Sequence, residues 1–151
     1  MPDEWIGIEE AINRLPPKPG VYIIRWCRNG EPVRIGRLRG EDSKGILYIG
    51  STKSLRRRVR QFLKSLSGGS GRIRHTMAKS YLFFSLNEVI RINEMEITWI
   101  ELNDDNEARR QEWLALKHYG KRFGELPPLN LQALRREVSG ELNQRLRNVI
   151  N

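Results

Sequence analysis

Residues 45–59 read GILYIGSTKSLRRRV, and this stretch predicts the centre of the fold. A short apolar run between two glycines opens it, which is typical of a buried strand. Ser54 then stands where a helix N-cap is expected, and apolar residues recur at helical spacing from residue 55 to residue 66. The pattern predicts a buried strand that leads directly into an amphipathic helix with a basic outer surface.

Segments on both sides of this unit show similar periodicities. Residues 21–27 and 97–102 are rich in β-branched and aromatic residues, which predicts two more strands, the second of them extending back to residues 82–84. Helical spacing is present in residues 4–15, 107–119 and 131–150. We therefore expect an α/β fold with a small, mainly antiparallel three-stranded central sheet flanked by helices, and an added C-terminal helix.

The length of 151 residues suits one domain with its own hydrophobic core. We expect a single domain over residues 1–151, with a core at about residues 17–131 and a C-terminal helical extension at residues 132–151. The connection between the first two strands is long and irregular.

Composition excludes several classes of protein. Cys27 is the only cysteine, so no internal disulfide and no cysteine-based zinc site can form within the chain. The sequence has no early run of 18 or more apolar residues and no signal-peptide pattern. We expect a soluble, cytoplasmic protein that does not enter a membrane.

The positive charge of the chain is concentrated in one block. Residues 43–87 contain ten of its 27 Lys and Arg residues and none of its 18 Asp and Glu residues. Such a block favours a polyphosphate ligand, because phosphate neutralisation releases condensed counterions. A solvated helix face or a patch for anionic lipids would give the same composition. The residues that we expect to bind nucleic acid are Lys53, Arg57, Arg60, Lys64, Arg72 and Arg74.

Five short motifs occur in a characteristic order. PGVY at residues 19–22, LYIG at 47–50 and SLRRRV at 54–59 resemble the two name-giving motifs and the first helix of the GIY-YIG nuclease family. EARRQE at residues 107–112 resembles its acidic helix, and PPLN at 127–130 resembles its closing Pro-x-x-Asn element. Each motif alone arises readily by chance, whereas five in the right order are specific.

This resemblance implies an enzyme that hydrolyses the DNA backbone with the help of one divalent cation, Mg²⁺ or Mn²⁺. It implies that Tyr22 orients or deprotonates the attacking water, and that Tyr48 binds a phosphate oxygen or supports the water. Arg58, ten positions after Tyr48, matches the catalytic arginine, and a guanidinium suits phosphate because it offers a fork of donors and keeps its charge.

The resemblance also assigns roles to residues near the end of the domain. Glu112 matches the acid that holds the metal, and a hard carboxylate is a ligand that Mg²⁺ prefers. Glu107 is the alternative, although it is better placed to stabilise the N-terminus of its helix. Asn130 matches the closing asparagine, whose amide would bond phosphate or a catalytic group.

The chain departs from the family pattern in two places. Phe62, four positions after Arg58, occupies a position where many members have histidine or tyrosine. We expect His75, from the loop after the first helix, to supply this group. The connection between Tyr22 and Tyr48 is longer than in compact members, which indicates an extra hairpin or small subdomain there.

Two alternative functions remain open from the sequence. One is a non-catalytic nucleic-acid-binding module that keeps the fold, and a more distant one is a basic membrane-surface or ribosome-associated protein. Because no second DNA-reading domain is evident, specificity would come from the core of the domain, from its insertions, from a homodimer or from a protein partner.

Overall fold

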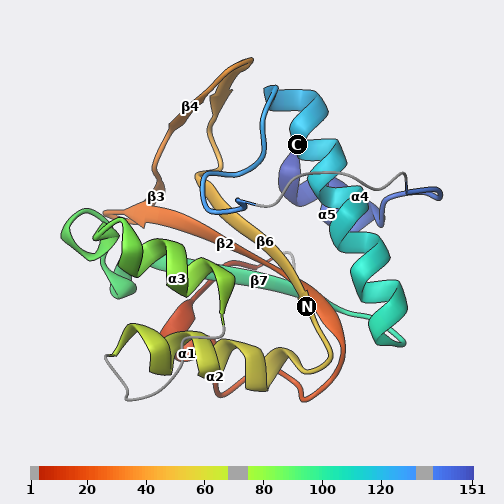
Figure 1. Ribbon diagram of the computed structural model, residues 1–151, viewed down its shortest axis with the longest axis horizontal. Coiled ribbons are helices and arrows are strands. Elements are labelled where there is room, and N and C mark those ends of the chain that lie inside the picture. The colour runs from red at the N-terminus through yellow and green to blue at the C-terminus, as the bar shows by residue number, and fades with distance from the viewer. Residues whose placement is uncertain (1–3, 68–74, 132–137) are drawn as a thin grey trace.

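The computed structural model describes residues 4–67, 75–131 and 138–151. Its centre is an antiparallel sheet in which β2 (Gly20–Arg28) lies between β6 (Ile46–Thr52) and β7 (Met95–Glu101) (Figure 1). These are the three expected strands, so the prediction of an α/β fold with a mainly antiparallel central sheet is confirmed. Two short strands, β1 (Ile6–Gly7) and β3 (Glu31–Pro32), pair with β7 and with the end of β2.

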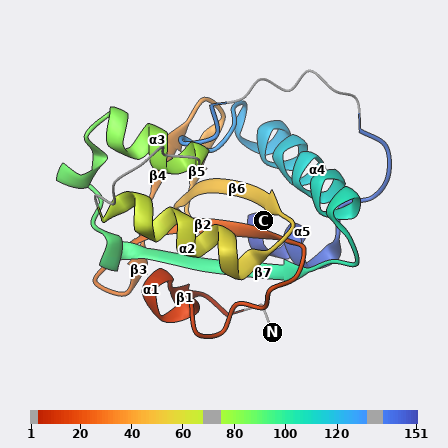
Figure 2. The ribbon, with the colours of Figure 1, turned by 60° about the horizontal axis from the view of Figure 1, so that its bottom comes forward.

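Helices cover both faces of this sheet (Figures 1 and 2). One face carries α1 (Ile8–Ala11), α2 (Leu55–Leu66) and α3 (Thr76–Phe83), and the other carries α4 (Asp105–Phe123) and α5 (Gln144–Ile150). Two 3-10 turns, η1 (Leu86–Glu88) and η2 (Ile92–Glu94), connect α3 to β7. In the parts of the chain that the structure describes, none of these helices is long and apolar enough to cross a lipid bilayer.

The central strand β2 is buried on both faces, which explains its continuous apolar sequence. Tyr22 and Ile24 join the core beneath α1, α2 and α3, whereas Val21 and Ile23 join the core beneath α4 and α5. Successive side chains of a strand point to opposite faces, so one apolar run fills two cores. The sheet is the middle layer of three.

Two predicted elements are replaced by others in the structure. Residues 82–84 form the end of α3 and its cap rather than a strand, and their apolar character does not mark burial because Phe83 and Phe84 are exposed. The helix predicted at residues 4–15 is replaced by β1 and the short α1, because Ile6 and Gly7 pair with β7. Tertiary pairing thus overrides local periodicity.

The C-terminal helix is confirmed but is shorter than the predicted span of residues 131–150. Its described part is α5, and residues 132–137 lie outside the described ranges. Residues 138–143 are not helical, and Gly140 among them has a φ of +109°. Asn143 begins the helix, since its side chain accepts a hydrogen bond from the Arg145 N–H group at 2.9 Å.

The long connection after β3 contains the expected extra hairpin, formed by β4 (Ile35–Arg37) and β5 (Gly40–Asp42) (Figure 1). Its base is fixed by the buried carboxylate of Asp42, which accepts two backbone hydrogen bonds from the following turn at 2.8 and 3.1 Å. The hydroxyl of Tyr119 on α4 donates a third bond to it at 2.8 Å. A buried carboxylate needs several donors to replace its lost hydration, and here they join the hairpin to α4.

Candidate active site

The two motif tyrosines lie side by side on neighbouring strands. Tyr22 on β2 and Tyr48 on β6 are both buried, and their ring centroids are 6.0 Å apart. Gly50 on β6 is the cross-strand partner of Tyr22, and a Cβ atom there would lie 2.7 Å from atoms of both rings. The glycine of the second motif therefore makes room for the pair of tyrosine rings.

His75 reaches this pair from the start of α3. Its ring packs against Phe62, with centroids 4.8 Å apart, and its Nε2 atom lies 2.9 Å from the Tyr22 hydroxyl oxygen. Its Nδ1 atom accepts the Met77 backbone N–H at 3.2 Å and so caps the helix. Because a backbone N–H can only donate, Nδ1 carries no proton, and a neutral His75 donates its Nε2–H to Tyr22.

Arg58 supplies the positive charge of the site. It lies half-buried on α2, beside the buried Val59, and its hydrogen bond and charge act to lower the pKa of Tyr22. Burial has the larger effect and keeps the pKa of Tyr22 well above its usual value. Burial likewise raises the pKa of Tyr48 to about 12, with a further contribution from the charge of Glu112. Both phenols are therefore neutral at pH 7.

The neutral state of His75 has the same origin. Burial, together with a smaller effect of the nearby positive charge of Arg58, lowers its pKa to about 3. A charged imidazole would be buried without a counterion next to a guanidinium. The site thus combines one permanent cation with three neutral hydrogen-bonding rings.

Glu112 approaches from α4, on the other side of β6. The backbone and the hydroxyl of Ser51, near the end of β6, donate hydrogen bonds to its carboxylate. Burial nevertheless raises the pKa of Glu112 above its usual value, although Ser51, Arg58 and Arg109 all act to lower it. Within the described ranges, no Lys or Arg side chain forms an ion pair with Glu112.

This carboxylate has the chemistry that a hard divalent cation requires. It is half-buried, held in place by Ser51, and not neutralised by an ion pair. Among the described residues there is no group of three or more His, Cys, Asp or Glu side chains able to hold a metal. A cation at Glu112 would therefore take most of its ligands from water and phosphate, as Mg²⁺ commonly does.

Asn130 acts on the site through the backbone of β6. Its Oδ1 atom accepts the Ile49 N–H, and its Nδ2 atom donates to the Ile49 carbonyl, both at 2.9 Å. Ile49 lies between Tyr48 and Gly50, so this buried amide holds the strand that carries the second motif. The amide therefore positions the second motif, and the expectation that it bonds phosphate or a catalytic group stays a prediction.

The predicted DNA-binding residues that the structure describes are exposed. They are Lys53, Arg57, Arg60 and Lys64. The last three share one face of α2, because they are spaced by three and four residues. Arg72 and Arg74 lie outside the described residues. Arg56 has a structural role instead, since its Nε atom donates to the Leu15 carbonyl at 2.8 Å.

Sequence reasoning missed the role of Gln111, which directly precedes Glu112. Its buried side chain donates to the Glu141 carbonyl at 3.3 Å and accepts the Asn143 N–H at 2.8 Å. It thereby fixes the C-terminal segment to α4. Glu107, the alternative metal residue, has its carboxylate bonded to Arg110 and Gln111 within the same helix.

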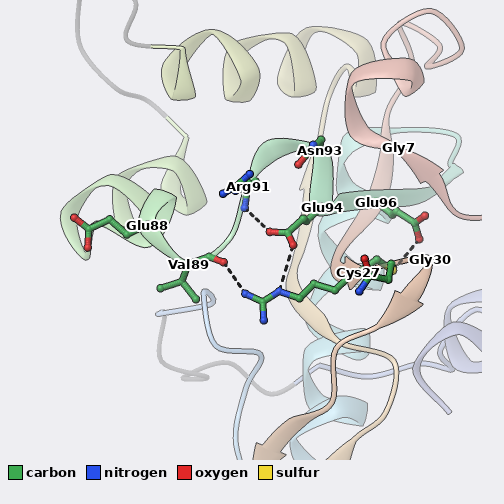
Figure 3. Close-up of a pocket in the computed structure, with 11 residues that line it drawn as sticks. Gly7, Cys27, Gly30, Glu88, Val89, Arg91, Asn93, Glu94 and Glu96 are labelled. Carbon is green, nitrogen blue, oxygen red and sulfur yellow. Dashed lines mark hydrogen bonds and ion pairs between the residues drawn. The ribbon is translucent and has the colours of Figure 1, made fainter.

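A separate hollow of about 580 Å³ lies at the opposite end of β2 (Figure 3). In this hollow the Glu94 carboxylate forms an ion pair with Arg28 at 3.3 Å and also accepts the backbone N–H of Arg91 at 2.9 Å. None of the site residues predicted from the sequence lines this hollow. The tyrosine site and this hollow are therefore distinct features.

Comparison with solved structures finds the GIY-YIG N-terminal endonuclease domain of UvrC from Thermotoga maritima, bound to its catalytic divalent cation, magnesium. The sequences are 22% identical and the TM-score is 0.43, over 82% of this chain and 96% of that chain.

Sequence relatives include UvrABC system protein C of Acetivibrio thermocellus, 32% identical over 96 residues, and that of Lachnospira eligens, 31% identical over 105 residues. These alignments cover 64% and 68% of this chain but only 12% and 14% of the relatives, so the chain spans a small part of their length. The family model described as GIY-YIG catalytic domain matches residues 18–125, a span that includes both motif tyrosines, Arg58, His75 and Glu112. With more than half of its sequence matched and these side chains gathered at one site, the chain belongs to the GIY-YIG family.

Proposed function

We propose that this chain is an endonuclease that hydrolyses phosphodiester bonds of DNA and depends on a divalent metal, Mg²⁺ or Mn²⁺. The observation that carries this proposal is the bond between His75 and Tyr22, formed beside Arg58 and Tyr48. Phosphodiester hydrolysis needs an oriented water, a cation for the charge on the phosphate, and stabilisation of the leaving oxygen. The family membership supports the same reaction.

Arg58 would bind the scissile phosphate. A guanidinium presents a planar fork of donors to phosphate oxygens and cannot lose its charge. Its half-buried position strengthens this interaction, because a charge acts more strongly where water is partly excluded. Tyr48, whose phenol is neutral, would donate its hydroxyl to a phosphate oxygen or support the water.

Tyr22 would orient the attacking water. Its oxygen receives the Nε2–H of His75 and a hydrogen bond from Arg58, and both stabilise negative charge on that atom. As the water oxygen attacks phosphorus, its proton would pass to a phosphate oxygen of the substrate and the bond to the leaving oxygen would break, while these donors hold the phenol in place. His75 acts through Tyr22, which makes it a positioning residue, and it takes the place of the side chain that Phe62 cannot provide.

Glu112 would hold the metal. When bound, the cation would stabilise charge on the phosphate and on the leaving oxygen. Ser51 keeps the carboxylate in position, and Asn130 holds the strand to which Ser51 belongs. The DNA backbone would follow the exposed face of α2, where Arg57, Arg60 and Lys64 lie. A homodimer or a protein partner would add to the selection of the substrate.

A non-catalytic DNA-binding module is the second candidate. One observation favours it, because neither phenol nor His75 has a pKa near 7 and so none is an evident general base. It predicts DNA binding without strand cleavage under any metal condition.

Plasmid nicking by the purified chain separates the two candidates. The wild type should nick supercoiled DNA with Mg²⁺ or Mn²⁺, and this nicking should stop in excess chelator. Glu112→Gln should nearly abolish nicking while DNA binding and circular dichroism stay unchanged. Glu107→Gln, a matched change in the same helix, should keep most of the activity. Nicking that persists in Glu112→Gln would contradict the proposal.

A further inference from the structure

An apolar groove lies at the end of α3 that is far from His75. It is lined by Phe83, Phe84 and Leu131, which are 81%, 56% and 60% exposed, and it encloses about 680 Å³. The two phenylalanine rings meet edge to face, with centroids 4.9 Å apart at 87°. Large apolar side chains clustered on a surface usually mark a binding site.

We propose that this groove binds an unpaired base of the DNA substrate, a few nucleotides away from the cleavage site. This inference rests on the proposed function, because it takes DNA as the ligand. Aromatic rings beside a positively charged track are the common means of holding single-stranded DNA, since every base offers a flat face for stacking. In a fully paired duplex the bases are stacked inside the helix, so none is free to enter the groove.

Both walls of the groove are connected along the chain to residues of the active site. One wall is α3, which begins at its cap His75 and ends at Phe83, and the other is Leu131, the residue after Asn130. A helix of eight residues rises about 12 Å. At about 3.4 Å per nucleotide of one strand, the groove lies roughly three nucleotides from His75.

The charge around the groove matches a nucleic acid. Lys79 lies on its edge and is exposed, so its ammonium group can meet the phosphate that follows a stacked base. Residues 43–87, which include α3, contain no carboxylate side chain that would repel the backbone. A stable protein interface usually involves roughly 20 to 30 residues a side, far more than the three exposed apolar side chains present here.

The test measures affinity for DNA in the presence of chelator, so that it does not require cleavage. Two labelled duplexes carry single-stranded extensions of four residues, one of thymidines and the other of abasic sugars with the same charge. By fluorescence anisotropy, the wild-type chain should bind the thymidine extension at least about fivefold more tightly, the factor expected for stacking one base. The Phe83→Leu/Phe84→Leu variant keeps the groove apolar but should bind both duplexes equally. Phe83→Tyr, which keeps the aromatic face, should retain the preference.

Equal binding of the two extensions by the wild type would overturn the inference. The inference would also be overturned if the wild type sedimented as a dimer, the Phe83→Leu/Phe84→Leu variant sedimented as a monomer, and neither preferred the extension with bases. The groove would then be a contact between two copies of the chain. A wild-type chain that prefers bases but nicks no DNA would contradict only the proposed function. A chain that nicks DNA and ignores bases would contradict only this inference.

Discussion

The Nε2 atom of His75 lies 2.9 Å from the hydroxyl oxygen of Tyr22, although 53 positions separate the two residues in the chain. The same imidazole caps α3 through Nδ1. One side chain therefore starts a helix and holds the motif tyrosine. A substitution at this position affects both functions unless it preserves the cap.

His75→Asn separates these two functions. Asparagine is a good N-cap, so α3 should persist, but its short side chain cannot reach Tyr22. Loss of the hydrogen bond that positions Tyr22 should slow nicking about 10- to 100-fold with little change in DNA affinity. His75→Ala removes the cap as well and should also lower the thermal midpoint. Equal nicking by the wild type and His75→Asn would show that the bond to Tyr22 has no catalytic role.

The low pKa of His75 predicts how stability depends on pH. Its pKa is about 3 in the folded chain against 6.5 for a free imidazole, so the unfolded chain binds a proton between these values that the folded chain does not. This group lowers the free energy of unfolding as pH falls from 6.5 toward 3, by up to about 1.4 kcal/mol per pH unit, and contributes no slope above that range. Urea unfolding from pH 7 to pH 4 should show a shallower slope for His75→Asn. If the free energy of unfolding fell equally steeply with pH in the wild type and in His75→Asn, His75 would be protonated in the folded chain.

Arg58→Lys keeps the charge but loses the fork of donors. Nicking should fall about 100-fold or more, as for the loss of one donor to the transition state. Arg57→Lys is the matched control, because Arg57 is the exposed neighbour, whereas Arg56 is tied to Leu15. Rates measured on plasmid should separate the two variants clearly. Equal losses would place the catalytic arginine elsewhere on α2.

The exposed face of α2 should set the salt dependence of DNA binding. The logarithm of affinity should fall with the logarithm of salt concentration at a slope near −0.9 per contacted phosphate. Charge reversal at Arg57 and Lys64 should make this slope less steep, as measured by titration at several salt concentrations. The same reversal at Arg145, an exposed arginine on α5, is the control. An unchanged slope in the α2 variant would place the DNA path on another surface.

The residues around the motifs were predictable because their patterns are local. A buried strand that turns directly into a capped helix fixes the spacing of Tyr48 and Arg58, and Ser54 does cap α2, accepting the Arg57 N–H at 3.4 Å. The alternation of β2 between two cores also follows from its apolar run. The ordered motifs indicated which side chains would meet at the site.

Other features depend on contacts that no local pattern encodes. Asp42 resembles any turn residue until Tyr119 from α4 donates to it, and Gln111 resembles any helix residue until the C-terminal segment folds over it. The apolar residues 82–84 predicted a strand. In the structure they form the end of α3 and its cap, where Phe83 and Phe84 are exposed. Apolar residues are buried more often than polar ones, but an individual apolar residue can be exposed.

The two hydrogen bonds between Asn130 and Ile49 also protect the sheet from other molecules. In the described ranges β6 pairs only with β2, and an unpaired outer strand invites intermolecular strand addition and aggregation. Asn130 occupies both polar groups of Ile49, and the Leu129 N–H donates to the Leu47 carbonyl at 3.0 Å. The turn at residues 127–130 thus stands in for a missing neighbouring strand. A shortened version of the domain that ends before this turn would leave the edge open and should be prone to form insoluble β-rich assemblies.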